Sequence, residues 1–329
     1  MNRIDLKRLP RQLGDHCLEI LRVYWVLVKV MLPAVVLVKL LDSLGATQWL
    51  GKLLSPLMSL VGLPAEMGLV WAAAILTNLY TAMVVFYELS AGHSLSVAQV
   101  SVLGLLILVA HSLPTEGAVA KLVGVRWRIT LVLRLGGAFL LAVLVHQLYR
   151  LGDWQQQPAQ MLWRPASSDP GLAAWILDQL LLFATILLVI SALMSLLRLL
   201  RWLGIERLMH WLLAPLLRVL QVGREATNVT IIGITLGLSF GAGLLVAEAR
   251  SGQISKRDMV LTICFLGLAH SLIEDTLLVL LLGADLYAIL WARFAFAVLV
   301  MALIARLWRA TPPRTRAVRS PLESKKPVA

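Results

Sequence analysis

Two segments of the chain carry the same kinds of polar residues inside otherwise apolar sequence. The residues are His111, Ser112 and Glu116 in the first segment, and His270, Ser271, Glu274 and Asp275 in the second. Ionisable groups within long apolar segments are costly to bury and are therefore candidates for a substrate- or ion-binding role. If the segments converge, the two imidazoles and three carboxylates would suit a divalent transition metal ion, or a proton relay.

A purely structural role explains the same residues without any ligand. Ser271 and Glu274 have the spacing of a capping box, in which the serine is the N-cap and the glutamate is the third helical residue. Ser112 would cap a helix in the same way, with Pro114 in the first turn, where proline is tolerated. On this interpretation the motif only starts the second half of a broken helix, although a helix N-terminus at that depth would also attract anionic groups.

One arginine lies at a matching position within the last apolar segment of each half of the chain. These residues are Arg134 and Arg293, and we include both among the candidate substrate- or ion-binding residues. A structural ion pair, or snorkelling of the long side chain toward the membrane interface, is the alternative explanation.

The elements that position these residues are expected to be membrane helices. Hydrophobic residues make up 59% of the 329 residues, charged residues only 15%, and the mean hydropathy is +0.83. Soluble domains have about 45–50% apolar and about 25% charged residues. The excess apolar content lies in runs of about 20 residues, the length that crosses a bilayer. The composition excludes an ordinary soluble domain and makes the lipid bilayer the first partner.

The net charge of +12 does not indicate a nucleic-acid partner. The basic residues lie mostly between apolar runs and in the tails, as in multi-pass membrane proteins. The basic N-terminus precedes a long apolar stretch without an evident small-residue cleavage site, which favours an uncleaved first helix over a signal peptide. We therefore expect no nucleic-acid binding.

The chain is a tandem repeat with an offset of 159 residues. The segment 111–113, His-Ser-Leu, recurs as 270–272. The same offset relates Arg134 to Arg293, Glu116 to Asp275 and Pro56 to Pro215. We assign residues 1–150 to the first membrane repeat, 151–310 to the second, and 311–329 to a basic cytosolic tail.

Each repeat is expected to hold three spans and one interrupted apolar segment. The expected spans cover 18–41, 67–87 and 129–148 in the first repeat, and 175–197, 228–246 and 288–307 in the second. The interrupted segments are 97–123 and 259–282, with the histidine motifs in the middle. If these segments turn back as re-entrant hairpins, each repeat has three crossings and the second repeat is inverted. If they span, each repeat has four crossings and the repeats are parallel.

The basic loop residues favour the hairpin arrangement. With a cytosolic N-terminus, it places eight basic residues inside (three in 121–128 and five in 198–224) and six outside, against five inside and nine outside for the spanning arrangement. Cytosolic loops carry an excess of lysine and arginine. We therefore expect an all-α polytopic membrane protein with six spans, two re-entrant hairpins, inverted repeats and both termini in the cytosol. Inverted repeats with broken helices place their binding sites near the bilayer midplane.

The second polar segment also carries a family resemblance. Residues 268–275, with the sequence LAHSLIED, precede an apolar half-helix and a last span that contains an arginine. In these features the chain resembles the nucleoside-recognition or Gate domain family, which includes spore maturation membrane proteins and has relatives in ferrous-iron and concentrative nucleoside transporters. The resemblance covers most of both repeats and implies a gate-like membrane fold. The chain lacks the GTPase domain of the ferrous-iron transporters, and it has few of the polar residues expected at a nucleoside site.

These features together predict a transport function. No Walker A, dinucleotide-binding or zinc-protease motif occurs, so we expect no cofactor and no enzymatic activity. We expect a secondary transporter or permease of the inner membrane that handles a small solute or a divalent cation at the histidine motifs. The alternative is a non-transporting membrane partner protein in which the motifs are helix caps, and an intramembrane enzyme is the third candidate. The sequence leaves open whether the chain forms a homo-oligomer.

Overall fold

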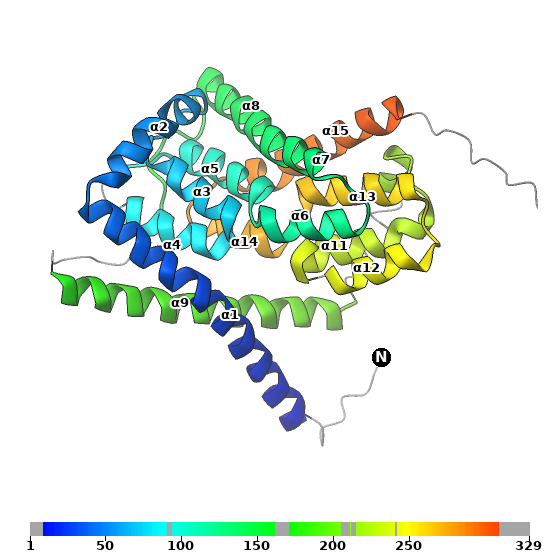
Figure 1. Ribbon diagram of the computed structural model, residues 1–329, viewed down its shortest axis with the longest axis horizontal. Coiled ribbons are helices and arrows are strands. Elements are labelled where there is room, and N and C mark those ends of the chain that lie inside the picture. Colours follow the sequence, from blue (N-terminus) through cyan, green and yellow to red (C-terminus); the bar gives the residue numbers. More distant parts are fainter. Residues whose placement is uncertain are drawn as a thin grey trace, which may run out of the picture.

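The protein is described by a computed structural model that covers residues 9–90, 94–161, 171–204, 211, 215–240 and 242–308. This part of the chain is helical and contains no strand (Figure 1). The expected tail at 311–329 lies outside the described residues, as do residues 162–170 of the linker between the expected repeats.

The helices of the two halves follow each other in the same order. The first half contains α1 (Leu9–Ser43), α2 (Ala46–Leu60), α3 (Met67–Leu76), α4 (Leu79–Ser90), α5 (Val97–Ala110), α6 (Leu113–Leu122), α7 (Trp127–Leu131), η1 (Val132–Gly136) and α8 (Gly137–Gly152). The second half contains α9 (Leu172–Trp202), η2 (Arg224–Ala226), α11 (Thr227–Phe240), α12 (Ala242–Ser251), α13 (Lys256–Ala269), α14 (Glu274–Leu280), η3 (Tyr287–Ala292) and α15 (Arg293–Leu307). The π-helical turn η1 contains Arg134, and η3 directly precedes Arg293, each inside one long final helix.

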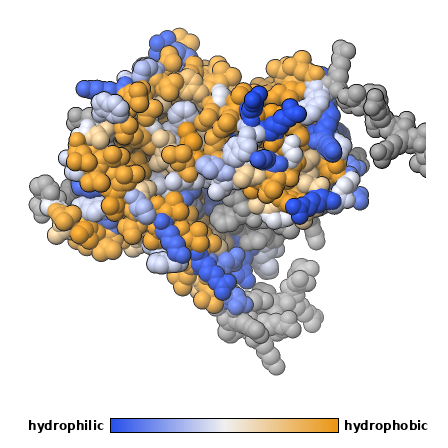
Figure 2. Space-filling view, in the orientation of Figure 1, coloured by the Kyte–Doolittle hydropathy of each residue, from blue (hydrophilic) through white to orange (hydrophobic). Residues whose placement is uncertain are grey.

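Six helical segments of the described chain are long and apolar enough to cross a membrane. They are Gly14–Leu41, Val97–Leu122, Trp127–Gly152, Leu172–Leu200, Lys256–Leu280 and Tyr287–Leu307. Large apolar side chains on the outer helices face outward, for example Val26 on α1, which is 62% exposed, and Leu188 on α9, which is 69% exposed. Apolar side chains cover much of the surface that Figure 2 shows. Lipid is the medium that removes such a surface from water, and the chain is a membrane protein.

The expected spans at 67–87 and 228–246 are each divided into two short helices. α3 and α4 meet at Thr77 and Asn78, where Thr77 leaves the helical region with φ −123° and ψ −96°. The Asn78 side chain accepts a hydrogen bond from the backbone N–H of Thr81 at 2.9 Å and so starts a new helix. In the second half the break lies at Gly237, inside α11, where the backbone has φ +76° and ψ 174°. The prediction of continuous spans here was wrong, because a side-chain hydrogen bond competes with the helix at Asn78 and Gly237 adopts a positive φ that a helix does not have.

Contacts at the helix starts show which segments turn back. The Gln99 side chain near the start of α5 donates to the carbonyl of Gly62, just before α3, at 2.9 Å. In the second half, the Arg257 side chain near the start of α13 donates to the carbonyl of Gln221, just before α11, also at 2.9 Å. The pairs α3–α4 and α11–α12 therefore return to the side on which they began, and within each pair the two helices pack against each other.

The hairpins are therefore not where the sequence placed them. The histidine-containing segments expected to be re-entrant are instead the long candidate spans Val97–Leu122 and Lys256–Leu280, each broken in the middle. α3–α4 and α11–α12 are the helical hairpins. The physical reason is that a break in hydrogen bonding does not by itself reverse a helix, and both segments of each half contain such a break.

On each of two opposite sides of the bundle, the ends of two helices contact each other. The Trp175 indole at the start of α9 donates to Glu88 at the end of α4, at 3.0 Å. At the other end of α9, Ser195 lies 3.2 Å from His16 at the start of α1. About 20 helical residues, or roughly 30 Å, separate the two ends of α9. The start of α1 therefore lies on the side opposite the hairpin α3–α4.

Candidate functional site

The two histidines meet where the broken helices α5 and α13 end. His111 is the C-cap of α5 and His270 is the C-cap of α13, and both have extended backbone angles. Their Nε2 atoms are 3.2 Å apart, and their ring centroids are 4.9 Å apart. The Nδ1 atom of His111 lies 3.1 Å from the carbonyl oxygen of Ile107, and that of His270 lies 2.8 Å from the carbonyl oxygen of Leu266. Every member of this arrangement recurs at the offset of 159 residues.

Backbone hydrogen bonds to the hairpins stabilise the break in each of the two histidine-containing segments. The serine after each histidine has a left-handed backbone, with φ +50° at Ser112 and φ +45° at Ser271. The N–H of Ser112 donates to the carbonyl of Ala74 in α3 at 2.9 Å, and that of Ser271 donates to the carbonyl of Gly233 in α11 at 3.3 Å. Each hairpin thus supplies the acceptor that the interrupted helix lacks at its break.

Neither serine caps the following helix with its side chain, so the capping-box interpretation was wrong. Ser112 stands at the N-cap of α6 without a side-chain cap bond, and α14 begins at Glu274 with Ile273 as its N-cap. A capping side chain needs an extended backbone, which the left-handed serines do not have. Side-chain caps occur instead at the outer ends of the broken segments, from Ser96 in α5 and Ser255 in α13.

One carboxylate from each half flanks the histidine pair. Glu116 Oε1 lies 3.3 Å from Nε2 of His270 and 3.8 Å from Nε2 of His111. Asp275 Oδ2 lies 3.7 Å from Nε2 of His111 and 4.0 Å from Nε2 of His270. The exposed fractions of His111, Glu116, His270 and Asp275 are 5%, 3%, 1% and 6%. The structure thus brings four of the five candidate metal ligands together in the interior.

The fifth candidate, Glu274, does not join this cluster. Its Oε1 atom accepts a hydrogen bond at 3.0 Å from the hydroxyl of Tyr80 on α4. Consecutive residues of a helix point about 100° apart, so Glu274 and Asp275 cannot face the same partner. The sequence offered no signal for Tyr80, because its position on the hairpin depends on the fold.

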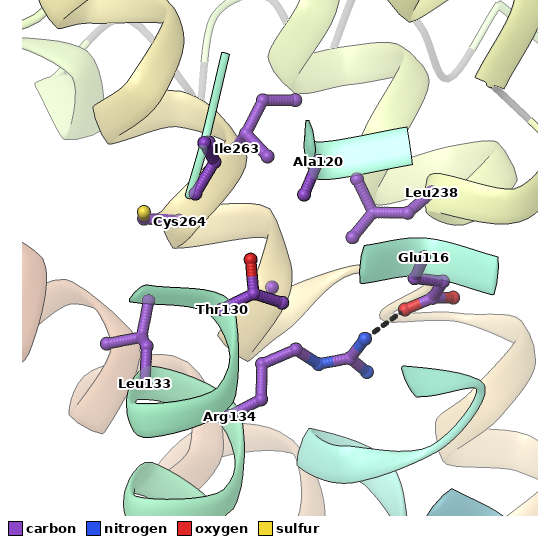
Figure 3. A pocket seen from close by; sticks show the side chains of 10 residues that line it. Glu116, Ala120, Thr130, Leu133, Arg134, Leu238, Ile263 and Cys264 are labelled. Atoms are coloured by element: carbon purple, nitrogen blue, oxygen red, sulfur yellow. Dashed lines mark hydrogen bonds and ion pairs between the residues drawn. The ribbon is translucent and has the colours of Figure 1, made fainter. Parts of the chain in front are cut away.

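Arg134 stabilises the break between α5 and α6 in the first half. Its Nε donates to the carbonyl of Val109 at 2.9 Å, and its Nη2 donates to the carbonyl of His111 at 2.8 Å. Its Nη1 forms an ion pair with Glu116 (Figure 3). Arg134 is only 1% exposed, so it does not snorkel toward the interface. The two carbonyl groups lie at the C-terminal end of α5, where the helix dipole favours a cation.

Arg293 repeats this arrangement in the second half with one difference. Its Nε donates to the carbonyl of Leu268 at 3.0 Å, and its Nη2 donates to the carbonyl of His270 at 2.8 Å. Its Nη1, however, has no hydrogen-bond partner, and neither does Oδ2 of Asp275, the residue that corresponds to Glu116. Arg293 is fully buried. Both arginines that the sequence analysis selected therefore contact the backbone at the ends of α5 and α13 and so position the two histidines.

A small cavity lies beside the Arg134–Glu116 pair (Figure 3). Its volume is about 10 Å³, and side chains of both halves line it, including Leu238, Ile263 and Cys264 from the second. A space of this size holds at most about one water molecule. This cavity therefore leaves no room for a larger solute beside the Arg134–Glu116 pair.

The hydrogen-bond partners of the two histidines determine which ring atoms face each other. A carbonyl oxygen can only accept, so each Nδ1 carries a proton, and in a neutral imidazole Nε2 is then an acceptor. Two acceptors thus face each other at 3.2 Å. A proton or a metal cation between the Nε2 atoms would satisfy both. His111, His270 and Asp275 each place one ligand atom within 4.8 Å of the other two.

The fold and this buried cluster define a helical membrane protein with two histidine-containing broken helices. The family model for Gate, described as nucleoside recognition, matches residues 24–126. The chain is also 31% identical over 295 residues, 88% of this chain and 92% of the relative, to a protein of Bacillus subtilis (strain 168) named uncharacterized membrane protein YvoD. The chain therefore belongs to the Gate family. No solved structure matches it.

Proposed function

We propose that the protein is a secondary transporter or permease of the inner membrane, for a small solute or a divalent cation that binds between the two histidine motifs. The proposal assigns it no enzymatic reaction and no nucleic-acid partner. The observation that carries it is the Nε2–Nε2 contact of 3.2 Å between His111 and His270. This contact joins equivalent residues of the two halves at the point where both helices are broken.

Broken helices suit a transport site because they bring backbone groups and polar side chains into the interior. Transporters built of repeats bind their substrates at the repeat interface, between discontinuous helices. Here a buried arginine and a hairpin contact the backbone at each break, and the side chains that meet between the breaks are imidazoles and carboxylates. These groups would select a cation or a solute with hydrogen-bond donors.

The burial of the cluster adds a mechanistic requirement. With exposed fractions of 6% or less for the four side chains, the conformation corresponds to an occluded state of a transporter. One half must move relative to the other before a ligand can exchange, and this is how alternating access operates in repeat-based transporters.

The test compares cells that lack the protein with cells that carry the wild type, His270→Ala, or His146→Ala as a control. His146 lies on α8 outside the cluster. An unbiased comparison of solute uptake and of cellular metal content should show a difference between deletion and wild type. His270→Ala should behave as the deletion while still being folded in the membrane, and His146→Ala should behave as the wild type. Full activity of His270→Ala, or no change in any solute or metal on deletion, would overturn the proposal in favour of a non-transporting membrane partner.

A further inference from the structure

We infer that the buried cluster binds a first-row divalent transition metal ion, with Nε2 of His111, Nε2 of His270 and a carboxylate oxygen of Asp275 as its ligands and Oε1 of Glu116 as the nearest further donor. The inference deepens the proposed function, since it names the substrate class of the same site. It commits to a metal ion rather than to a shared proton or an organic solute.

The donor set selects the class of metal. Imidazole nitrogen suits Zn²⁺, Fe²⁺ and neighbouring ions, whereas Mg²⁺ and Ca²⁺ are bound by oxygen ligands. Two imidazoles and two carboxylates form a mixed set of moderate softness. Cys264 is buried in α13, but it is not part of the ligand group formed by His111, His270 and Asp275. Soft ions that require thiolate are therefore not favoured.

The distances between donor atoms match a tetrahedral site. Metal–ligand bonds of about 2.0–2.2 Å place neighbouring donors in a tetrahedron about 3.3–3.6 Å apart. The Nε2 atoms of His111 and His270 are 3.2 Å apart, and Glu116 Oε1 is 3.3 Å from Nε2 of His270. Glu116 Oε1 is 3.8 Å from Nε2 of His111, and Asp275 Oδ2 is 3.7 Å and 4.0 Å from the two Nε2 atoms, so both carboxylates need to move by a few tenths of an ångström.

The groups that form hydrogen bonds with the ligand side chains are those that metal sites require. A histidine that binds a metal nearly always donates its other ring N–H to a carbonyl or a carboxylate, which fixes the orientation of the ring. Both histidines have a backbone carbonyl in this position, at 3.1 Å for His111 and 2.8 Å for His270. Glu116 is held in turn by Arg134. Three side chains are thus oriented before any ion arrives.

The unpartnered carboxylate oxygen is an independent observation that points to a ligand. Oδ2 of Asp275 has no hydrogen-bond partner, although the residue is only 6% exposed. A buried polar atom without a hydrogen bond is costly. Arg293 does not supply the partner, since it donates to the carbonyls of Leu268 and His270 instead. A divalent cation between the Nε2 atoms would coordinate this oxygen and both imidazole lone pairs at once, whereas a shared proton would bond only to the imidazoles and leave Oδ2 a longer charge interaction at 3.7 Å and 4.0 Å.

The experiment uses the purified full chain in lipid nanodiscs with Zn²⁺ and Co²⁺ as probes. Equilibrium dialysis against Zn²⁺ should give a single tight site, and Co²⁺ should give the intense visible absorption of tetrahedral coordination. His111→Ala and His270→Ala should each weaken Zn²⁺ binding by about 100-fold or more, and Asp275→Asn by at least about tenfold, since even groups behind the ligands contribute factors of 10–100. His146→Ala should bind as the wild type does.

Binding and transport are measured separately, so that the two proposals can fail separately. Absence of stoichiometric Zn²⁺ and Co²⁺ binding, or binding that survives both histidine substitutions, would overturn the metal inference. The transport proposal would stand in that case if His270→Ala still abolished the uptake of another solute. Tight binding that depends on both histidines, without any difference in uptake or metal content between deletion and wild-type cells, would support the metal site and overturn the transport proposal.

Discussion

Asp275 occupies the position in the second half that Glu116 occupies in the first, but only Glu116 forms an ion pair with the arginine of its half. The aspartate side chain is one methylene group shorter, and its Oδ2 atom faces the histidines at 3.7 Å and 4.0 Å instead. The site is therefore symmetric in its histidines and arginine–carbonyl contacts but asymmetric in its carboxylates. This asymmetry leads to two predictions.

Arg134→Met should destabilise the protein more than Arg293→Met. Loss of Arg134 leaves Glu116 buried without its ion-pair partner, and breaking such a pair costs about 3–5 kcal/mol. Loss of Arg293 leaves two backbone carbonyls without their donor, which we expect to cost about 1–3 kcal/mol. Thermal unfolding in detergent measures the difference, with Arg250→Met on the exposed end of α12 as the control. Equal losses for both buried arginines would show that the Glu116 pair contributes nothing of its own.

Asp275→Glu should stabilise the apo-protein. The added methylene would let the carboxylate reach Nη1 of Arg293, which lacks a partner, and a hydrogen bond between charged groups contributes about 1.5–3 kcal/mol. The melting temperature should rise, whereas Asp178→Glu on α9 should leave it unchanged. A lower melting temperature for Asp275→Glu would mean that the interior has no room for the longer side chain and that the asymmetry is enforced by packing.

Gly237→Ala should disrupt the hairpin α11–α12. Gly237 has φ +76° and ψ 174°, a region that only glycine adopts readily, and strain there costs about 1–3 kcal/mol. A Cβ atom would also collide with Oγ of Ser271, at the break of the interrupted helix. Gly243→Ala in α12 is the matched control, since a Cβ atom there meets nothing within 4 Å. Retention of wild-type stability and function by Gly237→Ala would show that the kink is dispensable.

The positions of the hairpins predict a revised membrane topology. If α3–α4 and α11–α12 do not cross and the N-terminus is cytosolic, residues Arg250, Lys256 and Arg257 join the cytosolic side. Eleven basic loop residues then lie inside and three, Lys52, Arg150 and Arg164, lie outside. This follows the positive-inside rule more closely than the eight and six of the arrangement expected from the sequence. On this topology we still expect both termini in the cytosol and an inverted second half.

Labelling of single cysteines with a membrane-impermeant maleimide tests this topology. Ser167→Cys and Gly252→Cys are introduced into a chain that carries Cys17→Ser and Cys264→Ala. We expect Ser167→Cys to react from outside the cell and Gly252→Cys only after the cytosolic face is exposed. Reaction of Gly252→Cys from outside would show that the re-entrant hairpins are instead 97–123 and 259–282. Reaction of Ser167→Cys only from the cytosolic side would exclude inverted halves.

The class of the protein could be predicted from the sequence because it depends on local chemistry. Runs of about 20 apolar residues have few stable alternatives to membrane helices, and the Gate resemblance was confirmed by the family match and by a 31% identical relative. The polar residues of the cluster could also be identified, because ionisable groups are rare in such runs and His111 and His270 recur at one offset.

The sequence by itself thus determined the membrane class, the offset of 159 residues and the identity of the residues that break the apolar segments. Only the tertiary structure decided which breaks reverse the chain, that Ser112 and Ser271 turn through a left-handed backbone rather than cap, and that Asp275 faces the histidines while Glu274 faces Tyr80. The physical reason is that a break releases backbone donors and acceptors without specifying their new partners. Those partners come from residues far away in the sequence, and their positions follow from the packing of all the helices together.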